Sequence, residues 1–230
     1  MKIEVFDDAR SLNEAAAGAV VSALEAGIRL NGTASLVATG GRSPGPVYDL
    51  MAFAPIEWTR VRVTLSDERW VDPSSPDSNE KLVRERLLKG RAAEAAFHPL
   101  RDREPSPEAA AEHASALFHS WPPLDAVMLG MGEDGHVASL FPGSPALELG
   151  LDPAAPACIV VPAGEGRPPP QTRLSLTIRG LTTAGLVVIL TSGAAKRAVL
   201  ERALEGGDPR ELPVRAVLQS ARAVRILWTA

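Results

Sequence analysis

Short aliphatic runs alternate with helical segments along the whole chain, and this alternation limits the fold more than any other feature. The runs have the length and the β-branched content of strands, and they lie at residues 3–6, 35–38, 61–65, 125–130, 158–161, 174–178, 186–190 and 224–228. Segments rich in Ala, Leu, Glu and Arg predict helices at 11–30, 46–53, 79–88, 106–118 and 195–204. Such alternation predicts an α/β fold with a largely parallel sheet that helices cover on both faces.

The composition is that of a globular protein with no general affinity for polyanions. The 230 residues are 45% hydrophobic and 23% charged, so the chain can bury a substantial core as one large domain or two small ones. A net charge of -4 argues against broad binding to nucleic acid or to a membrane surface. We therefore expect any anion to be recognised by a few placed cations.

Three further features concern cysteine, targeting and proline. The single cysteine, Cys158, excludes an internal disulfide and predicts a buried strand thiol. The acidic start and the shortness of the longest aliphatic run, 186–190, argue against a signal peptide or a membrane span, so we expect a cytoplasmic protein. The proline-rich residues 164–171 predict a surface loop or the edge of a small subdomain.

Ligands of open α/β sheets bind beyond the carboxyl ends of the strands, so the loops that follow predicted strands are the candidates for chemistry. Loops of unusual composition lie at 39–46 (TGGRSPGP), 66–79 (SDERWVDPSSPDSN), 131–145 (MGEDGHVASLFPGSP) and 191–196 (TSGAAK).

The first loop matches the G-x-S-x-G pattern of a hydrolase nucleophile elbow, with Ser43 at its centre. The residue after that serine must donate its backbone N–H to the oxyanion hole, and here it is Pro44, which has none. We therefore interpret Ser43 as the N-cap of a helix that Pro44 opens, with Gly40 and Gly41 allowing an anion to approach. An ordinary capped turn is the alternative.

The third loop contains G-x-G-x-x-G at Gly130–Gly135, but prolines at 142 and 145 end the segment too soon for the long helix of a dinucleotide site. The glycines instead expose Asp134 and His136 at the end of a strand, a position typical of acid–base chemistry. The other histidines, His98, His113 and His119, are expected to be ordinary surface or core residues.

Two other loops carry charged candidates. Asp67 to Arg69 follow a strand, and the sequence alone leaves open whether they are functional or merely a solvated run. Asn79 is predicted to cap the next helix. Lys196 lies in the first turn of a helix, where a cation opposes the helix dipole and is unfavourable unless an anion binds nearby.

Together and in this order, these loops resemble the 6-phosphogluconolactonase family, and the resemblance spans nearly the whole chain. The motifs on which the resemblance rests are TGGRSP, LSDERWV with its trailing SN, LGMGEDGHVASLFPGS, the arginine-led RLSLTI, TSGAAK, and LPVRAVLQ followed by VRILW. The resemblance implies a single domain over residues 1–230, built as a three-layer α/β/α sandwich. That fold is shared with glucosamine-6-phosphate deaminase and with sugar-phosphate-sensing domains.

The resemblance also implies site roles. His136 is the expected general base that activates water to hydrolyse 6-phosphogluconolactone, and Asp134 orients its imidazole. Arg69 contacts either the phosphate or the oxyanion. The expected substrate-binding residues are Gly40, Gly41, Arg42, Ser43, Asp67, Arg69 and Lys196.

Two other functions remain as alternatives, a deaminase or isomerase of sugar phosphates and a non-catalytic sugar-phosphate sensor. The intact Asp134-Gly135-His136 argues against the sensor. Residues 139–142 place an apolar residue where the deaminases have a glutamate, which argues against ring-opening isomerisation. We expect no cofactor and no metal, a small sugar-phosphate lactone as the partner, no nucleic acid or membrane partner, and a monomer or weak homodimer.

Overall fold

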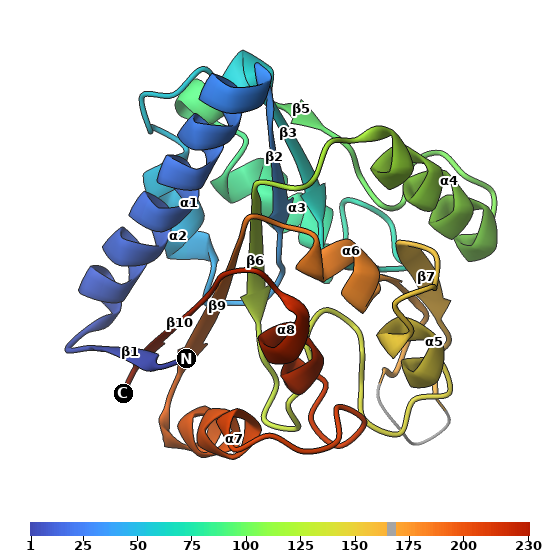
Figure 1. The fold of residues 1–230 in the computed structure, drawn as a ribbon. Helices are drawn as coiled ribbons and strands as arrows, with labels where there is room; N and C mark the ends of the chain where they lie inside the picture. The colour runs from blue at the N-terminus through green and yellow to red at the C-terminus, as the bar shows by residue number, and fades with distance from the viewer. Residues whose placement is uncertain (165–168) are drawn as a thin grey trace.

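In residues 1–164 and 169–230, which the computed structural model describes, seven parallel strands form the main sheet (Figure 1). Their order is β1-β10-β9-β6-β2-β3-β5. The strands are β1 (Ile3–Phe6), β2 (Ala34–Ala38), β3 (Val61–Leu65), β5 (Ala96–Phe97), β6 (Ala126–Gly130), β9 (Leu186–Ser192) and β10 (Val224–Thr229). The predicted parallel sheet is confirmed, and the carboxyl ends of its strands share one edge.

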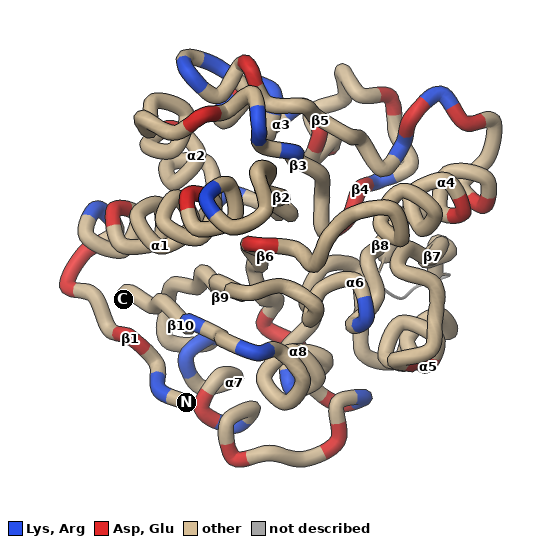
Figure 2. Tube along the Cα trace, turned by 45° about the horizontal axis from the view of Figure 1, so that its top comes forward, with Lys and Arg blue, Asp and Glu red and all other residues tan. Residues whose placement is uncertain are grey.

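Helices flank this sheet and complete the predicted α/β sandwich. They are α1 (Ala9–Asn31), α2 (Gly45–Met51), α3 (Asn79–Arg86), α4 (Pro107–Ser120), α5 (Leu147–Leu151), α6 (Ile178–Thr182), α7 (Ala194–Leu204) and α8 (Val214–Ser220), with short 3-10 turns at Trp58–Arg60 and Gly90–Glu94. Figure 2 shows α1 and α2 on one side of strands β9 and β10, and α7 and α8 on the other. Within the described residues, no helix combines the length and the apolar character that a membrane crossing requires.

Helix α1 shows how the sequence pattern becomes packing. Leu12, Ala16, Val20 and Leu24 recur every fourth residue and are all buried, so one face of the helix lies on the sheet. Full burial of a leucine side chain such as Leu24 contributes about 1.5–3 kcal/mol. At the amino end of the helix, the Asp8 carboxylate accepts a hydrogen bond from the backbone N–H of Ser11. At the carboxyl end, Gly32 terminates the helix in the left-handed conformation.

A second, antiparallel sheet contains strands that the alternation pattern does not separate from the first. In the described part of the chain its order is β4 (Asp67–Arg69), β8 (Arg173–Leu176) and β7 (Cys158–Val161). The runs at 158–161 and 174–178 are thus strands as predicted, but they pair antiparallel in this small sheet and not in the parallel main sheet. Strand periodicity does not reveal which strands pair, and this small sheet depends on contacts between distant segments.

The structure also bears on two smaller expectations, one for the cysteine and one for the proline-rich segment. Cys158 is buried in β7, and burial raises the pKa of its thiol to about 12, as a structural strand cysteine requires. Of the proline-rich segment predicted as a loop or subdomain edge, residues 165–168 lie outside the described residues.

Candidate active site

A cavity of about 210 Å³ lies at the carboxyl ends of β2, β6 and β9, against β4 of the small sheet. The predicted residues that line it are Gly40, Gly41, Arg42, Ser43, Asp67, Arg69, His136 and Lys196, and it is also lined by Asn79, Gly132 and Arg173. Asp134 does not line the cavity but contacts His136. The fold thus brings together side chains from every loop that the sequence singled out.

The imidazole of His136 is held by Asp134 from within the same loop. Nδ1 of His136 lies 2.6 Å from Oδ1 of Asp134, and the backbone N–H of His136 donates to the same oxygen over 3.1 Å. An ionised carboxylate can only accept hydrogen bonds, so Nδ1 carries the proton and Nε2 of the neutral ring keeps its lone pair. The pair therefore presents a base.

Glycine at position 132 makes this close approach possible. A Cβ there would overlap His136 Nδ1 and Asp134 Oδ1, whereas the turn itself is formed by Gly135 with φ +76°. The G-x-G-x-x-G pattern thus serves the imidazole–carboxylate pair instead of a dinucleotide.

Burial and hydrogen bonding act in opposite directions on Asp134. Burial raises the pKa of its carboxyl, but the hydrogen bond and charge of His136 together outweigh that effect, so the pKa lies below its usual value. Asp134 is therefore ionised at neutral pH and remains an acceptor for the ring.

An aromatic residue fixes the other side of the ring. Phe141 is buried, and its ring centroid lies 4.3 Å from that of His136. The His136 side chain remains 29% exposed, which leaves room for water beside it. Packing on one side and access on the other suit an acid–base group.

Asp67 belongs to a buried polar network and not to a solvated charge run. It is 5% exposed, and its Oδ2 accepts from the Ser139 hydroxyl over 2.6 Å. Oδ1 accepts from the Ser66 hydroxyl over 3.0 Å, and Nη1 of Arg173 lies 3.6 Å from Oδ2. The burial of Asp67 therefore favours a functional role for this residue over membership of a solvated charge run.

Two arginines face each other across the small sheet. The register of β4 and β8 places Arg69 opposite Arg173, an arrangement that is unfavourable for like charges unless anions lie nearby. Arg69 donates to the carbonyl oxygen of Asp77, yet Nε of each arginine is buried and has no hydrogen-bond partner among the described residues. Burial lowers the pKa of Arg173, as does the charge of Arg69, and the negative charge of Asp67 only partly offsets this.

These donors complement an anion. Together with Arg42 and Lys196 they form a cationic cluster, defined here as Arg42, Arg69, Arg173 and Lys196. Sequence reasoning did not place Arg173 in the site, although the arginine that begins RLSLTI was a signal for it.

Two predicted helix caps are wrong by one residue. Pro44, not Ser43, is the N-cap of α2, because its carbonyl oxygen accepts the first helical hydrogen bond, from the backbone N–H of Tyr48, and no side chain caps this helix. Ser43 stays exposed in the turn after Gly41, whose φ of +94° favours glycine. Ser78, not Asn79, caps α3 by accepting from the backbone N–H of Lys81, which frees the Asn79 side chain to face the cavity.

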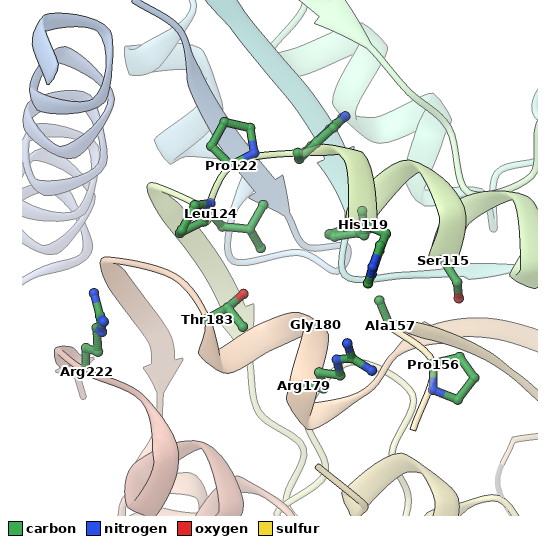
Figure 3. A pocket seen from close by; sticks show the side chains of 13 residues that line it. Ser115, His119, Pro122, Leu124, Pro156, Ala157, Arg179, Gly180, Thr183 and Arg222 are labelled. Carbon is green, nitrogen blue, oxygen red and sulfur yellow. The ribbon is translucent and has the colours of Figure 1, made fainter. Parts of the chain in front are cut away.

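A larger cavity, of about 560 Å³, lies elsewhere in the molecule (Figure 3). Leu124 and Arg222 come just before β6 and β10, so it lies toward the amino ends of those strands, away from the predicted loops. Among its described lining residues are cations, Arg179 and Arg222, but no carboxylate that could orient His119. The smaller cavity is thus the one equipped for acid–base chemistry.

Within the parts of the chain that are described, no three His, Cys, Asp or Glu side chains are grouped so that they could hold a metal ion.

Comparisons with known proteins agree on one family. The family model described as glucosamine-6-phosphate isomerases/6-phosphogluconolactonase matches residues 7–228. Proteins named 6-phosphogluconolactonase from Caulobacter vibrioides and Rhizobium meliloti are 44% and 42% identical, covering 99% and 98% of this chain and 97% of each relative. The crystal structure of a 6-phosphogluconolactonase from Shewanella baltica superposes with a TM-score of 0.92 at 35% identity, covering 99% of this chain and 97% of that one.

Proposed function

The chain belongs to the family of glucosamine-6-phosphate isomerases and 6-phosphogluconolactonases, and on this basis we propose that it hydrolyses 6-phospho-D-glucono-1,5-lactone to 6-phosphogluconate with His136 as the general base. As its likeness to the named lactonases indicates, it is an enzyme of the lactone-hydrolase class. The observation that carries the proposal for the base is the 2.6 Å contact between Asp134 and His136 at the edge of a cationic cavity.

The proposed reaction needs one water and one base. Nε2 of His136 takes a proton from water, and the water oxygen attacks C1 of the lactone, so that the carbonyl oxygen becomes an oxyanion. When the tetrahedral intermediate collapses, the bond from C1 to the ring oxygen breaks, and the imidazolium returns its proton to that oxygen. Asp134 stabilises the imidazolium that forms in between.

The cationic cluster supplies recognition. We assign Lys196, Arg42 and the Gly40–Gly41 turn to the 6-phosphate, since charge-assisted hydrogen bonds suit a dianion held by an otherwise acidic protein. Arg69 and Arg173 line the cavity, and we assign their guanidinium groups to the phosphate or to the oxyanion. Asp67 keeps the guanidinium group of Arg173 close by offering it a buried negative charge.

Phe141 supports hydrolysis over ring-opening isomerisation. It belongs to the segment where the sequence placed an apolar residue in the position of the deaminase glutamate, and its buried ring packs on His136. Among the described residues, that position holds no carboxylate, so no side chain there can shuttle the second proton that isomerisation needs.

The test is a hydrolysis assay with freshly generated 6-phosphogluconolactone, from which the spontaneous opening of the lactone is subtracted. We expect His136→Ala to lower kcat by about 10²- to 10⁴-fold, the usual contribution of a positioned general base, with little change in substrate affinity. His119→Ala is the matched control, because that exposed histidine lines the other cavity. Near-normal turnover by folded His136→Ala would remove this histidine from the mechanism.

A further inference from the structure

Glu68 is a buried carboxylate next to the active site that the proposed reaction does not use. Alternation along β4 directs Asp67 and Arg69 toward the cavity, while Glu68 is 2% exposed and does not line it. A buried carboxylate must be compensated by hydrogen bonds, since desolvation strongly disfavours its charge. Its contacts therefore indicate what it does.

Both oxygens of Glu68 join β4 to the start of α3. Oε1 accepts from the backbone N–H of Arg69 and of Asn79, each over 2.8 Å. Oε2 accepts from the backbone N–H of Glu80 over 2.7 Å and from the Ser78 hydroxyl over 3.0 Å. One side chain thus binds the free N–H groups at the amino end of α3 and the backbone of the cavity arginine.

The residues that it joins line the cavity on two sides. The Asn79 side chain donates from Nδ2 to the carbonyl oxygen of Asp67 over 2.8 Å. Its amide also lies so close to Gly40 that a Cβ on that glycine would overlap it. The start of α3 therefore links the Gly40 turn with Asp67 and Arg69.

We propose that Glu68 is a positioning residue: it fixes the position of Arg69 relative to Asn79, so that the Gly40 turn and the cationic cluster face one ligand. Burial raises the pKa of Glu68, and the four hydrogen bonds that its oxygens accept act against that effect. This inference rests on the proposed function for its substrate, a phosphorylated lactone.

The principal variant is Glu68→Gln, which keeps the shape of the side chain but places an amide N–H₂ where an acceptor stood. We expect kcat/KM for 6-phosphogluconolactone to fall about tenfold to a hundredfold, at a temperature where the variant is fully folded. The affinity for inorganic phosphate, measured by calorimetry, is expected to fall about threefold or more, because Asn79 no longer supports the Gly40 turn.

Two helix caps provide a matched pair should Glu68→Gln fold poorly. The side chains of Ser78 and Ser106 each accept a hydrogen bond, 3.2 Å long, from the backbone N–H of the residue three positions later. Neither serine lines the cavity, but only Ser78 also donates to Glu68. We expect Ser78→Ala to lower kcat/KM several-fold and Ser106→Ala to leave it unchanged, although both lose a helix cap.

The results separate the two proposals. A wild-type protein that does not accelerate lactone opening overturns the proposed function, and phosphate affinity in the variants then still decides the role of Glu68. If wild type is active and folded Glu68→Gln matches it in both kcat/KM and phosphate affinity, Glu68 only stabilises the fold. Equal kcat/KM in Ser78→Ala and Ser106→Ala leads to the same conclusion.

Discussion

At the scale of single residues, we assign to Asp134 the task of holding the imidazole of His136 in one tautomer and orientation. Because the pKa of Asp134 lies below its usual value, its carboxyl is ionised at neutral pH and can only accept a hydrogen bond. The 2.6 Å contact with Nδ1 then leaves Nε2 of the ring to face a water.

We accordingly expect Asp134→Asn to lower kcat by about 10²-fold, because the tautomer and orientation of His136 are no longer fixed. Steady-state rates at neutral pH test this, with Asp7→Asn as an exposed control. An unchanged kcat in the folded variant would contradict the assigned partnership.

Lys196, which lines the cavity, is the residue to which we assign a contribution to binding alone. An ammonium that holds the phosphate touches it equally in the ground state and in the transition state, so Lys196→Ala is expected to raise KM about tenfold to a hundredfold and to leave kcat nearly unchanged. A charge-assisted hydrogen bond of about 1.5–3 kcal/mol gives this magnitude. Unphosphorylated gluconolactone, assayed in parallel, is expected to be hydrolysed equally by variant and parent. A loss confined to kcat would move Lys196 to the reacting carbonyl.

At the scale of elements, an ion-pair cluster joins the two helices that flank the Gly40 turn. Asp49 of α2 accepts from Nε of Arg86 in α3 over 2.9 Å and from Nζ of Lys89 over 2.8 Å. The hydrogen bond from Arg86, assisted by Lys89, lowers the pKa of Asp49 to about 2, against a usual value of 3.8. A lowered folded-state pKa stabilises the protein above the usual value, and this stabilisation is lost as the pH falls from about 4 to about 2.

Asp49→Asn is therefore expected to lower the free energy of unfolding at pH 7 by about 0.2–1 kcal/mol, a small value because the pair is partly exposed. Near pH 2 the variant and the parent are expected to differ little. Denaturant unfolding at both pH values measures the difference. An equal loss at pH 7 and pH 2 would show that packing, and not charge, holds the two helices.

The elements also show where sequence reasoning reaches its limit. The loop residues Asp134 and His136 were predicted as candidates because the glycines of a loop that follows a strand expose them, while the resemblance, and not their spacing, implied that Asp134 orients the imidazole. Arg173 was missed as a site residue because its position depends on the antiparallel register between β4 and β8, which are about a hundred residues apart. Likewise, the burial of Asp67 depends on Ser139 and Arg173, and no pattern within residues 66–79 contains that information.

At the scale of the whole molecule, strand and helix periodicity predicted the architecture because parallel strands buried on both faces leave continuous apolar runs, as in β2 and β9. The separate small sheet was not predicted, since its strands have the same apolar character. The general position of the site followed from the rule that ligands bind at the carboxyl ends of parallel strands. The pairing of strands and the links between loops required coordinates.

The order of strands in the main sheet has a consequence for synthesis on the ribosome. β9 lies between β6 and β10 in space, yet it is made long after β6, and Arg173 and Lys196 are translated later than His136. A nascent chain that ends before β9 thus carries the imidazole, its carboxylate and Arg173, but it lacks Lys196 and leaves one edge of β6 unpaired. We therefore expect lactonase activity to emerge only after β9 and β10 have been made and the main sheet has closed.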